Sequence, residues 1–238
     1  MRIDVSDAEE AARRAGHELT RLLLLFQNSP ILLLLSGGSA LSLLSHVAPQ
    51  ACGPHVTLCL LDERAHGAEA SNQVALTRTS FYAAAYAQKV HVIDSGGDVL
   101  LHEGELGDRF REGLSNWKKE HPRGAVLATF GIGTDGHVAG IMPYPENPPL
   151  FLELFETNEV AVGYVALGKN QFPRRATVTL PFIRLIDGGV AYVIGEGKRS
   201  AVERVIFRNA LASTPAAILA HLPHVTLYTD ITGLPVVE

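Results

Sequence analysis

The chain has 238 residues, of which 47% are hydrophobic and 19% are charged, and its formal net charge is −5. Its isoelectric point near 6.1 gives no general attraction to nucleic acid or to an anionic membrane, so an anionic ligand would need a local cationic site. The two cysteines, Cys52 and Cys59, are too few for a disulfide framework and favour reduced thiols in a cytoplasmic protein.

The N-terminal region predicts a soluble protein that is neither exported nor membrane-bound. Residues 1–10 are acidic, whereas a secretory signal begins with basic residues. The leucine-rich runs 22–26 and 31–35 are separated by polar residues and a proline. Neither run approaches the roughly 20 apolar residues that cross a membrane.

Helices and strands are predicted to alternate along the chain. Ser6 and Glu9 have the spacing of a capping box, which predicts a helix to about Phe26 that ends before Pro30. Apolar runs bounded by turn residues predict buried strands. The predicted extended segments are residues 31–35, 56–61, 90–94, 125–130, 160–166, 176–180, 191–194 and 225–228. The predicted helices between them are residues 40–47, 99–119, 198–208 and 215–221, with a short helical stretch opened by Pro181.

This alternation predicts an α/β fold, with a mostly parallel sheet and helices on both of its faces. We find no repeat, low-complexity segment or long linker, so residues 1–238 are interpreted as one domain. The proline-rich residues 143–149 are interpreted as a loop inside that domain.

The most informative stretch is GIGTDGHVAG, residues 131–140, which directly follows a predicted strand. Glycines such as Gly133 let the backbone turn tightly and approach a ligand closely. Asp135 and His137 stand at the end of this turn, at the carboxyl end of a strand, where ligands bind in parallel sheets. The imidazole of His137 is suited to general-base chemistry near neutral pH. The alternative is a glycine-rich turn with a capping Asp and a surface His.

Two further strand ends carry polar residues. Gly37, Gly38 and Ser39 lie between a predicted strand and a predicted helix, where free N–H groups could bind an anion, although an ordinary tight turn would look the same. The triplet Asp62-Glu63-Arg64 follows the next strand, and Arg64 could act as a planar donor to an oxyanion or carboxylate. The alternative for the triplet is a solvated charge run.

Two weaker signals complete the pattern. Asn72 begins the next predicted helix, either as its cap or as part of a site. Lys169, Arg174 and Arg175 gather before a predicted strand in an acidic chain, which suits a phosphate clamp, although most basic loop residues are only solvated. The ten histidines include no HExxH pair and none joins a CxxC pair, so no metal site is predicted.

Taken in order, these segments resemble the 6-phosphogluconolactonase family, which belongs with the glucosamine-6-phosphate deaminase/isomerase superfamily. The residues that carry the resemblance are SGGS (36–39), LDER (61–64), SN (71–72), GIGTDGHVA (131–139), Lys169, RATVTLP (175–181) and GEGK (195–198). The resemblance implies a three-layer α/β fold, a mostly parallel twisted sheet with helices on both faces, as in ribose-5-phosphate isomerase and CoA transferases. It also implies that the reaction needs no metal or organic cofactor.

Two positions favour the lactonase branch of this superfamily. Arg64 stands where the deaminase branch usually has Tyr, and Met142 stands where deaminases carry a catalytic Glu. The chain departs from the usual lactonase pattern His-Thr-Ala-Ser-Leu-Phe-Pro at Val138, Gly140 and Ile141, as well as at Met142. These departures bear on the substrate and the activity more than on the fold.

The resemblance implies a hydrolase that opens 6-phosphoglucono-δ-lactone, in the oxidative pentose phosphate route. His137 is then the general base and Asp135 orients the loop or the imidazole, or serves only as a turn cap. Arg64 stabilises the oxyanion or holds the sugar.

The expected 6-phosphate ligands are the N–H groups of Gly37, Gly38 and Ser39, with Lys169 and Arg175. Asp62, Asn72 and Gly133 complete the expected substrate contacts. The partner expected is a phosphorylated sugar lactone, with no nucleic acid or membrane, for a monomer or small homo-oligomer. The alternatives are a glucosamine-6-phosphate deaminase or sugar-phosphate isomerase, and a non-catalytic sugar-phosphate sensor.

Overall fold

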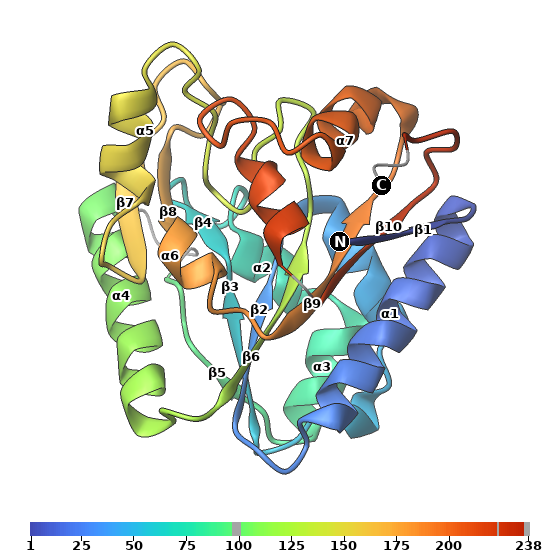
Figure 1. The fold of residues 1–238 in the computed structure, drawn as a ribbon. Helices are drawn as coiled ribbons and strands as arrows, with labels where there is room; N and C mark the ends of the chain where they lie inside the picture. Colours follow the sequence, from blue (N-terminus) through green and yellow to red (C-terminus); the bar gives the residue numbers. More distant parts are fainter. Residues whose placement is uncertain (97–100, 223, 236–238) are drawn as a thin grey trace.

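The fold is taken from a computed structural model that describes residues 1–96, 101–222 and 224–235. A large sheet crosses its centre, and all of its strand pairs are parallel (Figure 1). In sheet order its strands are β1 (Arg2–Val5), β10 (Val225–Thr229), β9 (Gly188–Val193), β6 (Ala125–Phe130), β2 (Ile31–Leu35), β3 (Val56–Leu60) and β5 (His91–Val92). Every residue of β2, β3 and β6 is buried, which explains why these strands are apolar on both faces.

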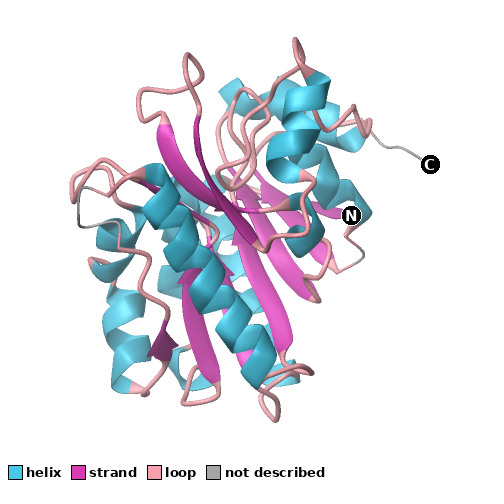
Figure 2. Cartoon of the chain, turned by 90° about the vertical axis from the view of Figure 1, so that its left-hand side faces the viewer, coloured by secondary structure: helices cyan, strands magenta, loops and turns pink. Residues whose placement is uncertain are grey.

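A second, smaller sheet is antiparallel and stands beyond one end of the large sheet (Figure 2). Its strands, in order, are β4 (Asp62–Arg64), β8 (Arg174–Val178) and β7 (Ala161–Val165). Because β4 follows β3 after a single residue, the carboxyl end of the large sheet leads directly into the small one. The pairing of Arg64 with Arg175 across β4 and β8 brings two cationic residues far apart in sequence to the same place.

Helices cover both faces of the large sheet, with α1 and α4 on opposite sides of it in Figure 1. The helix α1 (Ala8–Leu25) packs on β9 and β10. The helix α4 (Glu103–Glu120) buries Phe110, Leu114 and Trp117, a spacing that lines one helix face, and it also packs on β7 and β8. The Nε1 of Trp117 donates a hydrogen bond to the Thr57 hydroxyl of β3 at 3.1 Å. The three-layer α/β prediction is therefore confirmed.

The remaining helical segments are short. The α-helices are α2 (Asn72–Thr77), α3 (Ser80–Ala87), α5 (Pro148–Phe155), α6 (Leu180–Ile183) and α7 (Arg199–Ile206). The 3₁₀ segments are η1 (Gly38–His46), η2 (Pro49–Ala51), η3 (Glu196–Lys198) and η4 (Pro215–His221). No helix of the described residues is both long and apolar enough to span a bilayer.

The structure corrects four local predictions. The predicted capping box at Ser6 is wrong, because the Asp7 carboxylate caps α1 by accepting from the Glu10 N–H at 2.9 Å. The Ser6 N–H instead bonds to the Thr229 carbonyl at 3.0 Å, which extends the pairing of β10 with β1. The strand β1 was not predicted from the sequence. Residues 40–47 and 215–221 are predicted as helices and are 3₁₀ segments, the first mostly within η1 and the second forming η4.

The fourth correction is α5, which begins within the predicted loop 143–149 at Pro148, with the Asn147 side chain as its cap. Proline has no N–H to lose at the first turn of a helix, so a proline-rich run can start one. The start predicted for the helix at residues 99–119 falls at Val99, outside the described residues.

Candidate active site

A cavity of about 190 Å³ opens where the carboxyl ends of β2, β3 and β6 meet the small sheet. It is lined by Ser36, Gly37, Gly38, Ser39, Asp62, Arg64, Asn72, Gly131, Ile132, Gly133, His137, Ala139, Arg175 and Lys198. The structure thus brings together nine of the eleven site residues expected from the sequence. Of the other two, Asp135 stands behind His137 and Lys169 is not among the lining residues.

The loop of residues 131–140 is folded tightly around the histidine. The Gly133 N–H bonds to the His137 carbonyl at 3.0 Å, and the Gly136 N–H bonds to the Gly133 carbonyl at 2.9 Å. A Cβ atom on Gly133 would lie 2.1 Å from His137 Nδ1, so only glycine leaves room for the imidazole. Ala139 has a φ of 51°, a strained value for a residue with a side chain.

Two residues of the small sheet hold the end of this loop. The Tyr164 hydroxyl donates to the Gly140 carbonyl at 2.5 Å, and the Gly140 N–H donates to the Thr177 hydroxyl at 3.0 Å. The small sheet therefore fixes the strained turn that carries His137.

His137 and Asp135 form a hydrogen-bonded pair. His137 Nδ1 lies 2.6 Å from Asp135 Oδ1, which also accepts the His137 backbone N–H at 3.1 Å. Burial raises the pKa of Asp135, but its hydrogen bonds and ionic attraction to His137 outweigh burial, and the net pKa is below the ordinary value. A carboxylate at Nδ1 favours the tautomer with its proton on Nδ1, so the Nε2 lone pair of neutral His137 is free to accept a proton.

The loop of residues 36–39 offers backbone donors to the same cavity. Gly37 is the N-cap of η1 and has no side-chain capping bond, so the first N–H groups of this helical segment are open to a ligand. Gly38 has a φ of 64°, which favours glycine. Ser36 joins this loop to the histidine loop, because its hydroxyl accepts the Gly131 N–H at 3.3 Å.

The triplet Asp62-Glu63-Arg64 forms an edge strand of the small sheet in which Asp62 and Glu63 are buried, so its alternative as a solvated charge run is wrong. The buried Glu63 carboxylate accepts the Arg64 and Asn72 N–H groups, both at 2.7 Å, and the Ser71 hydroxyl at 2.9 Å. Burial raises the pKa of Glu63 and these hydrogen bonds partly offset the rise. Glu63 thereby ties β4 to the start of α2.

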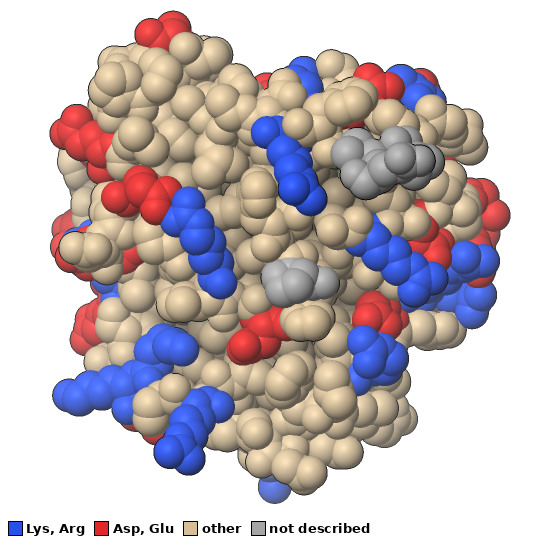
Figure 3. All heavy atoms as spheres, viewed as in Figure 1, with Lys and Arg blue, Asp and Glu red and all other residues tan. Residues whose placement is uncertain are grey.

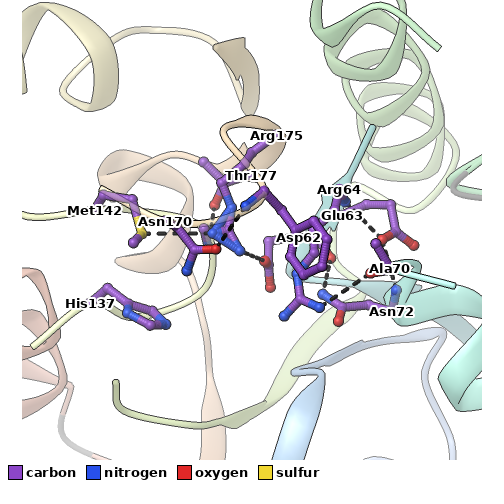
Figure 4. Close-up of polar contacts among 12 residues, drawn as sticks. Asp62, Glu63, Arg64, Ala70, Asn72, His137, Met142, Asn170, Arg175 and Thr177 are labelled. Atoms are coloured by element: carbon purple, nitrogen blue, oxygen red, sulfur yellow. Dashed lines mark hydrogen bonds and ion pairs between the residues drawn. The ribbon is translucent and has the colours of Figure 1, made fainter. Parts of the chain in front are cut away.

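Asn72 is a buried wall residue of the cavity and not a helix cap. The cap of α2 is Ser71, whose hydroxyl accepts the Val74 N–H at 3.1 Å. The Asn72 Nδ2 donates to the Asp62 carbonyl at 3.0 Å (Figure 4). A Cβ on Gly37 would lie 2.2 Å from Asn72 Oδ1, so the glycine loop and this amide pack directly together.

Arg175 is a buried cation with few partners. Its side chain is 2% exposed, and its contacts are Asp62 Oδ2, 3.8 Å from Nη2, and the Met142 sulfur, 3.7 Å from Nη1 (Figure 4). Its buried Nε has no hydrogen-bond partner among the described residues. A buried guanidinium with spare donors is a strong site for an anion, since it would otherwise leave polar groups unsatisfied.

Lys198 is a lining residue that sequence reasoning did not assign to the site. It follows β9 and the turn at Gly195, whose φ is 100°. Burial lowers the pKa of Lys198, and a bound anion would oppose that shift. The signal was present in the GEGK segment, which carried part of the family resemblance.

Lys169 has other partners than the expected phosphate. Its ammonium group pairs with the Glu146 carboxylate and lies 4.6 Å from the centre of the Tyr144 ring. The side chain of Lys169 is thus committed to the loop that carries Glu146, and the cationic wall of the cavity is made by Arg64, Arg175 and Lys198. Within the part of the chain that the structure describes, no His, Cys, Asp and Glu side chains cluster as metal ligands.

A family model described as "Glucosamine-6-phosphate isomerases/6-phosphogluconolactonase" matches residues 6–228 of the chain. The chain belongs to this family. Its similarity to the human 6-phosphogluconolactonase is 25% identity over 203 residues, which cover 80% of this chain and 73% of the human protein. A probable 6-phosphogluconolactonase 1 of Arabidopsis thaliana is 31% identical over 98 residues, 41% of this chain and 34% of the plant protein.

Solved structures of the same family share the fold. The 6-phosphogluconolactonase of Trypanosoma brucei superposes with a TM-score of 0.74 at 16% identity, covering 96% of this chain and 95% of that one. The protein from Leishmania guyanensis gives a TM-score of 0.73 at 17% identity, over 99% of each chain. Family members therefore keep this architecture at low sequence identity.

Proposed function

We propose that the protein hydrolyses 6-phosphoglucono-δ-lactone to 6-phosphogluconate. The observation that carries the proposal is the free Nε2 of His137, backed by Asp135 at Nδ1, in a cavity whose wall holds the under-paired Arg175. A base and a cationic wall around one small cavity suit a substrate that has an uncharged electrophilic carbonyl group and, elsewhere in the molecule, a phosphate.

In this mechanism His137 Nε2 takes a proton from water as the water oxygen attacks the lactone carbonyl. The resulting tetrahedral oxyanion is stabilised by the guanidinium of Arg64. The bond between the carbonyl carbon and the ring oxygen then breaks, and the proton held by His137 passes to that oxygen. The first products are a carboxylic acid and a free hydroxyl, and the acid then releases its proton to solvent as it becomes a carboxylate, so atoms and charges balance without a cofactor.

The 6-phosphate is assigned to the glycine-rich loop and to the other two cations of the cavity. The open N–H groups at residues 37–39 would donate hydrogen bonds to two or three of its oxygens, and Arg175 and Lys198 would supply the positive charge. Asp62 and Asn72 also line the cavity, where they would contact the sugar hydroxyls. The remaining predictions, of a single domain in the cytoplasm acting in the pentose phosphate route as a monomer or small homo-oligomer, belong to the same proposal.

The family also contains isomerases of glucosamine 6-phosphate, and the cavity disfavours that chemistry. Met142 is fully buried with its sulfur against Arg175, and a thioether cannot transfer protons as a carboxylate does. The position at which a deaminase carries its acid therefore has no proton-transferring group in this chain.

The test is to incubate the protein with freshly prepared 6-phosphogluconolactone and, separately, with glucosamine 6-phosphate. We expect ring opening of the lactone well above its spontaneous rate, measured as proton release, and no ammonia from the amino sugar. Steady ammonia release coupled to formation of fructose 6-phosphate would overturn the assignment. Tight binding of 6-phosphogluconate without turnover of either substrate would favour the non-catalytic sensor.

A further inference from the structure

An aromatic side chain outside the cavity lies against one of the cationic residues in its wall. The Arg64 guanidinium carbon is 5.4 Å from the centre of the Phe172 ring. The His66 ring packs on the same Phe172, with 5.3 Å between ring centres and a tilt of 57°. Phe172 itself is not a lining residue of the cavity.

We propose that Phe172 is a positioning residue, which holds the Arg64 guanidinium where it can act on the substrate, with His66 supporting the ring. The proposal deepens the proposed function and rests on it, because it takes Arg64 to contact the reacting lactone. Phe172 and His66 would act only through Arg64.

Arg64 has few other contacts to fix its direction. Its Nη1 donates to the Ala70 carbonyl at 3.2 Å, and its buried Nε has no hydrogen-bond partner among the described residues (Figure 4). The nearby acids are engaged elsewhere, since Asp62 pairs with Arg175 and Glu63 binds the start of α2. One hydrogen bond leaves a long side chain free to rotate, so the face of an aromatic ring is the remaining constraint.

The loop that carries Phe172 is anchored at both ends. The Ala166 N–H bonds to the Pro173 carbonyl at 2.7 Å, and the Ala65 N–H bonds to the Arg174 carbonyl at 2.9 Å. The Phe172 N–H donates to the Asn170 side chain at 3.0 Å, which forms a local turn. The backbone that carries the Phe172 ring is therefore held in place, and the ring can restrain the flexible Arg64 side chain.

His66 supports the ring without adding a charge beside Arg64. Burial lowers the pKa of His66, and the positive charges of Arg174, Arg175 and Arg64 lower it further. A neutral imidazole can pack on Phe172, whereas an imidazolium would repel the guanidinium. Phe172 is thus in contact with both His66 and Arg64.

The test separates the ring face from simple apolar bulk. Phe172→Leu keeps an apolar side chain but has no aromatic face, and Phe172→Tyr keeps the face. We expect Phe172→Leu to lower kcat for 6-phosphogluconolactone about tenfold, the size of a partly desolvated cation–π contact, with KM less changed. Phe172→Tyr should stay within about twofold of wild type, and the melting temperatures should match.

A double-mutant cycle with Arg64→Ala shows whether the effect passes through the guanidinium. In that background Phe172→Leu should cause no further loss of activity. Phe207→Leu, which alters an exposed phenylalanine on the border of α7, is the matched control and should leave kcat unchanged. Equal losses for Phe172→Leu and Phe172→Tyr, or an undiminished loss in the Arg64→Ala background, would overturn the proposal.

A readout that needs no activity keeps the two proposals distinguishable. The Arg64 Nε–H resonance, assigned by its absence in Arg64→Lys, should be displaced by the ring current of Phe172 in the wild-type protein. The displacement should persist in Phe172→Tyr and vanish in Phe172→Leu. If the wild-type protein shows the displaced resonance but does not hydrolyse the lactone, the lactonase function is refuted and the positioning of Arg64 by Phe172 stands. If it hydrolyses the lactone but shows no displaced resonance, the positioning proposal is refuted and the lactonase function stands.

Discussion

At the scale of single residues, the sequence left open whether Asp135 orients the His137 imidazole or only caps the turn, and the structure shows contacts for both roles. Asp135 Oδ1 accepts a hydrogen bond from the backbone N–H of His137 and lies at hydrogen-bond distance from its ring Nδ1. Asp135 therefore shapes the turn and orients the imidazole at the same time. Because the net pKa of Asp135 is lowered, the stabilising effect of its carboxylate is present above its unfolded pKa and is lost as pH falls through the folded pKa.

His137→Ala should lower kcat by a factor on the order of 10²–10⁴, the usual contribution of a general base. Asp135→Asn should lower kcat about tenfold to a hundredfold, because an amide at Nδ1 no longer fixes one tautomer. Both variants should still fold with only a small fall in melting temperature, since each removes one ionic contact on a loop at the cavity. Activity of His137→Ala within threefold of wild type in the lactone assay would show that another group activates the water.

The phosphate assignment predicts a difference between two substrates. Lys198→Ala and Arg175→Ala should raise KM for the phosphorylated lactone about tenfold or more, since each charge-assisted hydrogen bond contributes about 1.5–3 kcal/mol. The lactone without phosphate should be affected much less, and the ratio of the two KM values cancels any partial unfolding of Arg175→Ala. Lys169→Ala is the matched control, because the Lys169 ammonium group is paired with Glu146. In this variant the ratio of KM for the two lactones should stay near the wild-type ratio.

At the scale of elements, apolar runs are predicted well because burial alone decides them. The strands β2, β3 and β6 and most of the cavity-lining residues at their ends follow directly from the sequence. The charged β4 was not predicted as a strand because its stability comes from pairing with β8 and from the hydrogen bonds of Glu63, partners distant in sequence. The placements of Lys169 and Lys198 depend in the same way on which loops meet in space.

The packing of α4 on the small sheet depends on two glycines that face each other. A Cβ on Gly163 of β7 would lie 1.9 Å from the Glu103 carbonyl, and one on Gly107 of α4 would lie 2.3 Å from the Gly163 nitrogen. Backbone atoms cannot give way as flexible side chains do. The close approach of β7 and α4 is therefore specific to glycine.

Gly163→Ala should destabilise the protein by about 1–3 kcal/mol, as overpacking does in a buried contact. This corresponds to a fall in melting temperature of about 2–4 °C for each kcal/mol in a chain of this size. Gly197→Ala is the control, because a Cβ there has no atom within 4 Å and its φ is not in the left-handed region. Equal melting temperatures for the two variants would show that α4 can move away from β7 at little cost.

At the scale of the whole molecule, the site lies at the junction of the two sheets, with one wall from each. The large sheet supplies the loops at residues 36–39 and 131–140, and the small sheet supplies Arg64 and Arg175. On the face seen in Figure 3, charged side chains of both signs are spread over a largely uncharged surface, with several Lys and Arg side chains gathered at the lower left of the view. Selection of an anionic substrate by a chain of net charge −5 therefore depends on the cavity and not on the general surface.

The two thiols report on the stability of this assembly. Cys52 is 4% exposed and Cys59, on β3, is 2% exposed. Burial raises the pKa of Cys52 to about 11 and that of Cys59 to about 12, so both are protonated and unreactive at neutral pH. A thiol reagent can then reach them only when the chain opens.

We expect a disulfide reagent such as dithionitrobenzoate to label neither cysteine in the native protein and both in denaturant. When opening limits the reaction, a ligand that binds only the folded state slows labelling through the same equilibrium. Saturation with 6-phosphogluconate at 100 times its Kd should lower the labelling rate about 100-fold, equivalent to about 2.7 kcal/mol. Glucose, which has no phosphate, should give no protection. Rapid labelling of the native protein, or labelling of Cys59 unchanged by a ligand shown to bind, would mean that β3 opens independently of the site at its end.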